Sequence, residues 1–263
     1  MNSRKPKKFF KRLDSSCFLI LVVPCFNEES RWNLKYWESI SLIHGITLYF
    51  INDGSQDQTS AKISCLTKDT QHVLFKLPKN LGKAEAIRFG FQEAVLKNPI
   101  GIGFLDADGA FSIEDVRTQI STFKRLNRSR QNPVSVWSSR VQLAGRNIER
   151  KMVRHYIARI LVTILARTFK FKIYDTQSGM KIFPLTPTLV ACIQKKFQTR
   201  WFIDLELYLR WRSHEKRDME IWEEPVLAWR DVQGSKLSRS QYLTILNDLR
   251  KLKSYKTESH NVK

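Results

Sequence analysis

Residues 100–109 read IGIGFLDADG, so an apolar β-type run over Ile100–Leu105 ends directly in two aspartates. Similar short runs occur before and after it, and segments with helical spacing lie between them. Strands that alternate with helices predict an α/β fold in which helices wrap a mostly parallel sheet. The other runs of this kind are Cys17–Val23, Ile46–Ile51, His72–Phe75 and Val134–Trp137.

The length of 263 residues and the hydrophobic content of 42% predict one sizeable core. The chain has no internal repeat and no low-complexity linker that would separate two domains. We therefore expect a basic N-terminal arm over residues 1–14 and a single domain over 15–238. A C-terminal amphipathic helix and tail follow over 239–263.

The N-terminus resembles a signal peptide, because six basic residues over Arg4–Arg12 precede an apolar run. Pro24 interrupts that run and no small-residue cleavage site follows, which argues against export. No run reaches the roughly 18 apolar residues that a membrane-spanning helix needs. The four cysteines form no pair at metal-ligand spacing and no disulfide framework, which favours a reducing, cytoplasmic setting.

The formal net charge of +20 indicates a polyanionic partner, such as nucleic acid, an anionic membrane surface or phosphorylated small molecules. The stretch 140–172 contains nine Lys or Arg residues and one acidic residue. Apolar residues recur at helical spacing over 151–167 and again over 241–253, with basic residues off that face. Such basic amphipathic helices fit the interface of an anionic membrane. They also fit helices that pack on the sheet and expose a solvated basic face.

Four loops are expected to meet at one edge of the sheet, because ligands of such folds gather at the carboxyl ends of the strands. Each predicted strand in the first half is followed by polar or glycine-containing sequence. These segments are Pro24–Glu28, Asn52–Ser55, Asn80–Lys83 and Asp106–Gly109.

Asp106 and Asp108 can both present oxygens to one hard cation, since side chains two residues apart in extended backbone point the same way. Mg²⁺ or Mn²⁺ is the natural occupant of such a site. The same residues can instead form a turn before the next helix, because Asp-x-Asp-Gly is common turn chemistry.

The remaining loop residues each allow a binding and a structural interpretation. Asp53 can accept a hydrogen bond from a nucleobase, or it can form an Asx turn. Pro24 and Phe26 can wall one side of a base, although an aromatic residue beside a strand is more often core. Lys83 can reach a phosphate, or it can be a solvated lysine at a helix start.

Seven motifs follow one another along the chain and resolve part of this ambiguity. They are LVVPCFNEES (21–30), NDGSQDQTS (52–60), NLGKAEAIRFG (80–90), LDADGAFSIEDV (105–116), DTQSGMKIF (175–183), RWFIDLEL (200–207) and GSKL (234–237). In this order they resemble the family-2 glycosyltransferases with a GT-A fold. The last three, with Gly109-Ala110, resemble more narrowly the dolichyl-phosphate β-glucosyltransferases and related polyprenyl-phosphate hexosyltransferases.

The resemblance implies a role for each matching residue. A nucleotide-sugar donor would contact Pro24, Phe26, Glu28, Asp53, Lys83, Asp106, Arg200 and Lys236. The metal would lie on Asp106 and Asp108. The acceptor phosphate would contact Ser139 and Arg140, which match a Ser-Arg element of the family. Arg154, on the basic side of the 151–167 helix, is a further candidate for acceptor binding. The residues expected to act directly in catalysis are Asp108, Asp204 and Arg140.

Four positions, in three of the motifs, depart from the family pattern. Phe26 stands where the family usually has tyrosine, which keeps the ring and loses a hydroxyl. Ala84-Glu85 replaces a more usual glycine pair. Ala110 cannot ligate a metal, so water or donor phosphate would complete the coordination shell. The resemblance also implies an N-terminal spanning helix, which eukaryotic glucosyl relatives carry, whereas the sequence predicts a basic arm at this end.

The nature of the acceptor decides whether a general base is required. A phosphate monoester is already a nucleophile near neutral pH, because its second pKa is about 6. A sugar hydroxyl would need a base, for which Asp204 and Asp175 are the candidates. Either carboxylate also fits a structural role, Asp175 in a turn and Asp204 at a helix start.

The expected function is therefore inverting transfer of a hexose, most simply glucose from UDP-glucose, to a polyprenyl or dolichyl phosphate. The expected location is the cytoplasmic face of a membrane, with peripheral attachment directly or through a membrane-protein partner. A GT-A enzyme acting on a soluble hydroxyl acceptor is the alternative. A nucleic-acid-binding module is disfavoured, since the chain has no recognised reader motif and no aromatic stacking platform.

Overall fold

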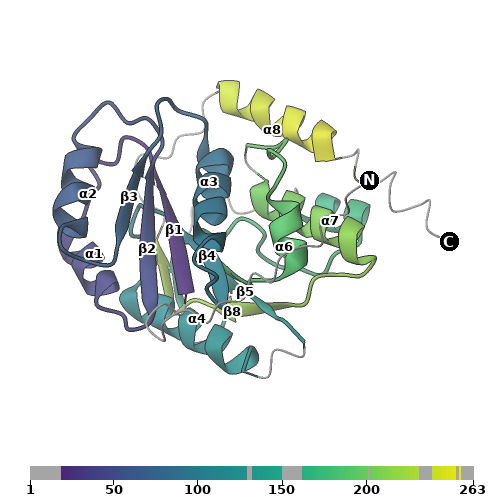
Figure 1. Cartoon of the computed structure of the whole chain (residues 1–263). Helices are drawn as coiled ribbons and strands as arrows, with labels where there is room; N and C mark the ends of the chain where they lie inside the picture. The colour runs from purple at the N-terminus through teal and green to yellow at the C-terminus, as the bar shows by residue number, and fades with distance from the viewer. Residues whose placement is uncertain are drawn as a thin grey trace, which may run out of the picture.

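The computed structural model describes residues 19–128, 132–149, 162–200, 202–230, 239–252 and 255. Strands and helices alternate through the first half, as predicted (Figure 1). The strands are β1 Leu19–Cys25, β2 Ile46–Asn52, β3 Val73–Lys76, β4 Gly101–Leu105, β5 Ser135–Ser139, β6 Asn147–Glu149, β7 Met180–Pro184, β8 Ile221–Pro225 and β9 Ala228–Arg230. The helices are α1 Leu34–Ser41, α2 Thr59–Thr67, α3 Lys83–Val95, α4 Ile113–Leu126, α6 Pro187–Cys192, α7 Ile203–Glu215 and α8 Arg239–Leu252.

Seven strands form one mixed sheet in the order β3-β2-β1-β4-β7-β5-β8. The pairs β2–β3, β1–β2, β1–β4 and β5–β8 are parallel, whereas β7 runs antiparallel to both β4 and β5. The predicted α/β class and mostly parallel sheet are confirmed, and all five predicted strands are present within two residues of their expected bounds. The antiparallel strand β7 in the middle of the sheet was not predicted. Strands β6 and β9 pair separately.

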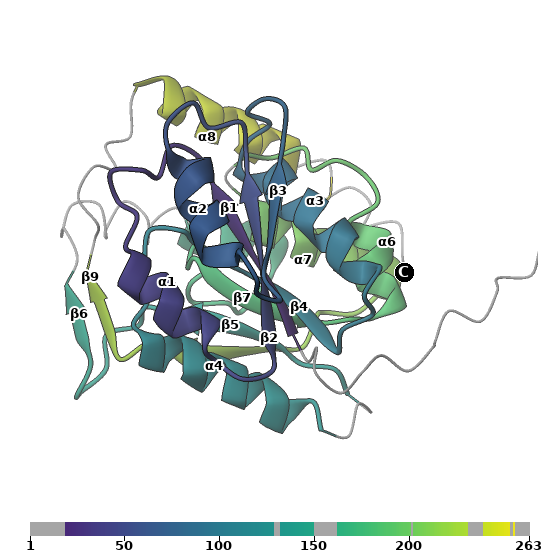
Figure 2. The ribbon, with the colours of Figure 1, turned by 60° about the vertical axis from the view of Figure 1, so that its left-hand side comes forward.

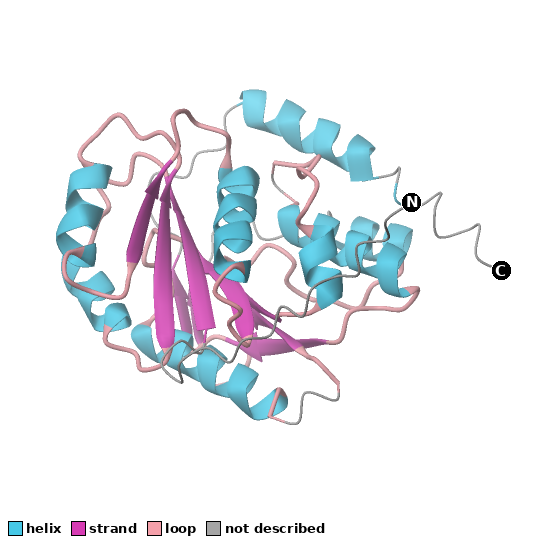
Figure 3. Cartoon of the chain, viewed as in Figure 1, coloured by secondary structure: helices cyan, strands magenta, loops and turns pink. Residues whose placement is uncertain are grey.

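Helices cover both faces of the sheet (Figures 2 and 3). Successive residues of β1 point to opposite faces, as the pleat of a strand requires. Ile20 and Val22 join a core with α3, α6 and α7, whereas Leu19 and Leu21 join a core with α1, α2 and α4. Because β1 is buried on both faces, its sequence LILVVPC is a continuous apolar run rather than an alternating one.

The described parts of the two basic amphipathic helices pack on the body of the protein. Of the helix predicted over 151–167, residues 162–169 are helical, and Leu165 and Phe169 lie in the core beside α7. The helix predicted over 241–253 is α8, and its Leu249 and Leu252 pack against the same core. This packing matches the second of the two interpretations for these faces, and interfacial helices are not shown. Residues 151–161, with Arg154, lie outside the described residues, as does the predicted arm 1–14.

Among the described residues, no helix is both long and apolar enough to span a bilayer.

Candidate functional site

The carboxyl ends of β1, β2 and β4 lie side by side, as the loop pattern predicted. Cys25 of β1 is in register with Asn52 of β2, and Val22 is in register with Phe104 of β4. The loops after β1 and β2 are also joined directly, because Asn27 N–H donates to Ser55 Oγ at 3.0 Å. The described loop residues predicted to bind a donor therefore meet at one sheet edge.

Asp53 orients the loop that leads into α3. Its Oδ1 accepts from Leu81 N–H at 2.7 Å and its Oδ2 accepts from Gly82 N–H at 2.8 Å. Burial raises the pKa of Asp53, while these two hydrogen bonds and the charge of Arg200 act in the opposite direction. The Asx-type contact to Ser55 N–H, at 2.9 Å, comes from Asn52 instead. Asp53 is buried, and each of its carboxylate oxygens keeps a lone pair beyond these two hydrogen bonds.

Arg200 lies over the same loop although it is far away in sequence. Gly82 has φ +94°, and a Cβ built there would lie 3.3 Å from Arg200 Nη2. Glycine is therefore required at position 82 for its backbone conformation, and its missing side chain lets the guanidinium approach. Asp53, Gly82 and Arg200 form one wall of the site.

Asp106 and Asp108 follow β4 at the centre of this edge. Asp106 N–H donates to Gly179 O at 2.9 Å, and Asp106 Oδ1 lies 2.5 Å from Lys83 Nζ. Asp108 Oδ1 accepts from Ala110 N–H at 3.1 Å, which is a turn contact. Burial raises the pKa of Asp108, and the negative charge of Asp106 raises it further. The two aspartates are thus close enough to repel one another, as expected of a pair that shares a cation.

The surroundings of Asp106 fit a bound divalent cation. A Cβ at Gly179 would clash with the Asp106 carboxylate, so the glycine leaves the space that the carboxylate occupies. Lys83 supplies one positive charge to the pair. Within the described residues, no group of three His, Cys, Asp or Glu side chains could hold a metal by itself. Asp106 and Asp108 would therefore share a cation with ligands such as donor phosphate and water.

Glu28, Phe26 and Pro24 line the side of the site next to β1. Glu28 is buried and forms an ion pair with Arg31 at 2.7 Å. Burial raises the pKa of Glu28, Arg31 lowers it, and the negative charges of Asp108 and Asp106 raise it. Phe26 is 43% exposed, so its ring is not part of the core, whereas Pro24 is half-buried at the end of β1. An exposed ring at this position is free to contact a ligand.

Arg140 is held by Asp175 rather than left in solvent. Its Nε donates to Asp175 Oδ2 at 2.7 Å, its Nη2 donates to Oδ1 at 2.8 Å, and the guanidinium lies over the Trp229 ring. Burial acts to raise the pKa of Asp175, but the charge and hydrogen bonds of Arg140 outweigh it and hold that pKa well below its usual range. Ser139, next to Arg140, is buried at the end of β5. Asp175 is thus a poor proton acceptor, which favours its structural interpretation.

Asp204 is also engaged in an ion pair. Its Oδ2 accepts from Lys181 Nζ at 2.7 Å, and its Oδ1 accepts from Leu205 N–H at 2.9 Å. Lys181 is fully buried, lies over the Trp137 ring and donates to Ser178 O at 2.6 Å. This geometry favours the structural alternative for Asp204. Sequence reasoning missed Lys181, for which the signal was a lysine inside the apolar run MKIF over 180–183.

The sequence comparison assigns the chain to a family. The family model described as "Glycosyl transferase family 2" matches residues 20–184, more than half of the chain. The chain belongs to glycosyl transferase family 2. The protein is therefore an enzyme whose chemistry is glycosyl transfer.

Two curated relatives show distant similarity over most of their length. A dolichyl-phosphate beta-glucosyltransferase of Trichomonas vaginalis is 29% identical over 90% of this chain and 73% of the relative. A dolichyl-phosphate beta-glucosyltransferase of Saccharomyces cerevisiae is 28% identical over 86% of this chain and 70% of the relative.

Solved structures share the fold at low sequence identity. Glucosyl-3-phosphoglycerate synthase of Mycobacterium tuberculosis, in complex with Mn²⁺, UDP and glucosyl-3-phosphoglycerate, gives a TM-score of 0.59 at 17% identity, over 88% of this chain and 80% of that one. The same synthase in complex with Mg²⁺ and UDP also gives 0.59, over 88% and 79%. The predicted GT-A-like fold is therefore confirmed, while the role of each site residue stays a prediction. Lys236 and Arg154 lie outside the described residues.

Proposed function

We propose that this enzyme transfers a hexose, glucose, from UDP-glucose to a polyprenyl or dolichyl phosphate, with inversion at the anomeric carbon. The observation that carries the proposal is the junction of Asp106, Asp108, Lys83, Asp53 and Arg200 at one sheet edge. The carboxylates of this group would bind a cation, and its lysine and arginine would bind phosphates. A nucleoside diphosphate requires this combination of side chains.

The donor would lie across the ends of β1, β2 and β4. Phe26 would contact the base, and Asp53 would accept from its N–H group with the lone pairs that the loop leaves available. Lys83 and Arg200 would neutralise the phosphates from the two sides of Gly82. The UDP bound by the synthase of the same fold supports this choice of nucleotide.

Asp106 and Asp108 would hold Mg²⁺ or Mn²⁺ against the diphosphate. The bound cation would supply charge neutralisation for the leaving nucleoside diphosphate. Both cations occur with UDP in the structurally similar synthase. On metal binding, Lys83 would move from Asp106 towards donor phosphate, because both cations compete for the same carboxylate oxygen.

A phosphate acceptor is supported by the state of the two candidate bases. Asp175 and Asp204 each form an ion pair with a buried or half-buried cation, which gives both carboxylates a structural role. A phosphate monoester needs no such base, whereas a sugar hydroxyl does. Arg140 and Ser139 would position the acceptor phosphate, together with Arg154. The two dolichyl-phosphate glucosyltransferases support the same acceptor class.

The proposed place of action is the cytoplasmic face of a membrane, where polyprenyl phosphates are embedded. The net charge of +20 favours peripheral attachment to anionic lipid, directly or through a membrane-protein partner.

The test is incubation of the protein with Mn²⁺, radiolabelled UDP-glucose and polyprenyl phosphate in detergent, followed by partition into organic solvent. Transfer of label into the organic phase, and its loss in Asp108→Asn, would support the proposal. GDP-mannose serves as the donor control. Label that enters a soluble glycan and never the lipid would refute the lipid acceptor and favour the alternative hydroxyl acceptor.

A further inference from the structure

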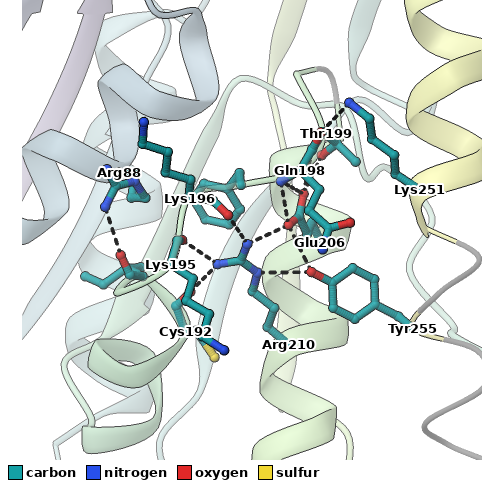
Figure 4. A network of polar contacts seen from close by, with 12 residues as sticks. Arg88, Cys192, Lys195, Lys196, Gln198, Thr199, Glu206, Arg210, Lys251 and Tyr255 are labelled. Atoms are coloured by element: carbon teal, nitrogen blue, oxygen red, sulfur yellow. Dashed lines mark hydrogen bonds and ion pairs between the residues drawn. The ribbon is translucent and has the colours of Figure 1, made fainter.

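The segment 192–199, which leads to Arg200, is contacted by side chains from three helices (Figure 4). From α3, Glu85 Oε1 accepts from Phe197 N–H at 3.0 Å. From α7, Arg210 Nη1 donates to the carbonyl oxygens of Cys192 and Lys195, each at 2.7 Å. These contacts close the end of α6 and fix the course of the chain before Arg200.

Glu206 of α7 is fully buried and binds the next part of the loop. Its carboxylate accepts from the N–H groups of Gln198 and Thr199, at 2.9 and 2.8 Å, and from the Thr199 hydroxyl at 2.8 Å. Arg210 Nη2 forms an ion pair with Glu206 Oε1 at 2.7 Å, and the Tyr255 hydroxyl donates a hydrogen bond to the same oxygen at 3.1 Å. A buried carboxylate with this many hydrogen-bond donors is held rigidly in place.

Helix α8 makes the last contact, on the backbone of Arg200 itself. Asp248 is fully buried, and its Oδ2 accepts from Arg200 N–H at 2.7 Å. One turn along, Lys251 Nζ donates to Gln198 O at 2.8 Å. The side chain of Arg200 extends over Gly82. It lies next to the N–H groups of Leu81 and Gly82, which donate hydrogen bonds to Asp53.

We propose that α8 is a positioning element of the donor site, and that Asp248 acts on donor binding through Arg200. The inference rests on the proposed function, because it assigns Arg200 to the donor diphosphate. Asp248 fixes where the Arg200 backbone lies, and Gly82 leaves room for the guanidinium. A helix at the far end of the chain therefore sets the geometry of a site built mainly from the first half.

The experiment is a double-mutant cycle on UDP affinity, measured by calorimetry with Mn²⁺ and without acceptor. Asp248→Ala is expected to weaken UDP binding roughly tenfold, because the lost hydrogen bond releases the Arg200 backbone. Asp248→Asn, which keeps an acceptor oxygen, should restore affinity to within about threefold of wild type. Asn247→Ala, on the exposed side of the same helix, is the matched control and should leave affinity unchanged.

Measuring Asp248→Ala in a protein that also carries Arg200→Gln separates the positioning of Arg200 from a general loss of stability. If Asp248 acts through Arg200, adding Asp248→Ala to Arg200→Gln should cause no further loss, since the group to be positioned is absent. An equal loss in both backgrounds, or no loss in either, would overturn the proposal. Lys251→Gln, a change at a half-exposed side chain, gives the same comparison if Asp248→Ala does not fold. Absence of UDP binding by the wild-type protein would overturn the proposed function and this inference with it, whereas binding without coupling overturns the inference alone.

Discussion

A Lys181→Met substitution removes the cation that Asp204 faces in the core behind the site. Lys181 is fully buried, and its Nζ donates to Asp204 Oδ2 at 2.7 Å, to Ser178 O at 2.6 Å and to Thr176 O at 3.2 Å. Methionine has a similar length and fills the same space against Phe104 and Trp137 without charge. The change therefore isolates the ion pair from packing.

The expected loss of stability is about 3–5 kcal/mol, because one partner of a buried pair is left without compensation. For a protein of this size, that loss corresponds to a decrease in Tm of roughly 6–20 °C. Asp204→Leu should cost a similar amount, since it leaves the Lys181 ammonium among carbonyl oxygens and rings. The double variant should lose at least about 2 kcal/mol less than the sum of both, because neither charge then remains.

Urea unfolding followed by circular dichroism gives the free energy of unfolding of the wild type, the two single variants and the double variant. Titration of the folded variants with Mn²⁺ gives the affinity of the site for the cation. Lys181 holds the 176–179 loop, and this loop contacts Asp106 through Gly179. Loss of the Lys181–Asp204 ion pair should therefore lower the affinity for Mn²⁺. Additive losses in the cycle, or a loss below about 1 kcal/mol in either single variant, would refute the reasoning.

Three further changes test other parts of the structure. Gly179→Ala should reduce Mn²⁺-dependent transfer at least about 100-fold with little change in Tm, because the added Cβ clashes with the Asp106 carboxylate; transfer near the wild-type rate contradicts this. Lys83→Met should tighten Mn²⁺ binding without nucleotide and weaken UDP binding, since Lys83 pairs with Asp106; calorimetry with each ligand separates the two effects. Burial lowers the pKa of His72 below 6.5, so the unfolded chain binds more protons, and unfolding free energy should decrease as pH falls below about 6.5. His72→Gln should flatten that decrease in urea melts between pH 7.5 and 5, and an unchanged slope counts against it.

Much of the fold follows from local pattern. The five predicted strands are present because short apolar runs between amphipathic segments have few alternatives to a buried parallel sheet. The junction of Asp53 and Asp106 at one edge was likewise predictable, because the carboxyl ends of parallel strands lie at the same edge of a sheet.

The interpretation of single charged residues was less predictable. Asp204 looked like a candidate base until its neighbour was known, and that neighbour is Lys181 on the antiparallel strand β7. Nothing local indicates that β7 enters the sheet between β4 and β5, since this pairing joins segments distant in sequence. A lysine in an apolar run is equally consistent with an exposed edge.

By itself, the sequence determined the fold class, the family resemblance and the strand-end residues, because these depend on periodicity and on motifs of a few consecutive residues. The tertiary structure decided which charges face one another. It paired Lys83 with Asp106, Arg140 with Asp175 and Asp248 with the Arg200 backbone. Such pairs depend on distances between segments far apart in the chain, and electrostatic and hydrogen-bond energies fall steeply over those distances.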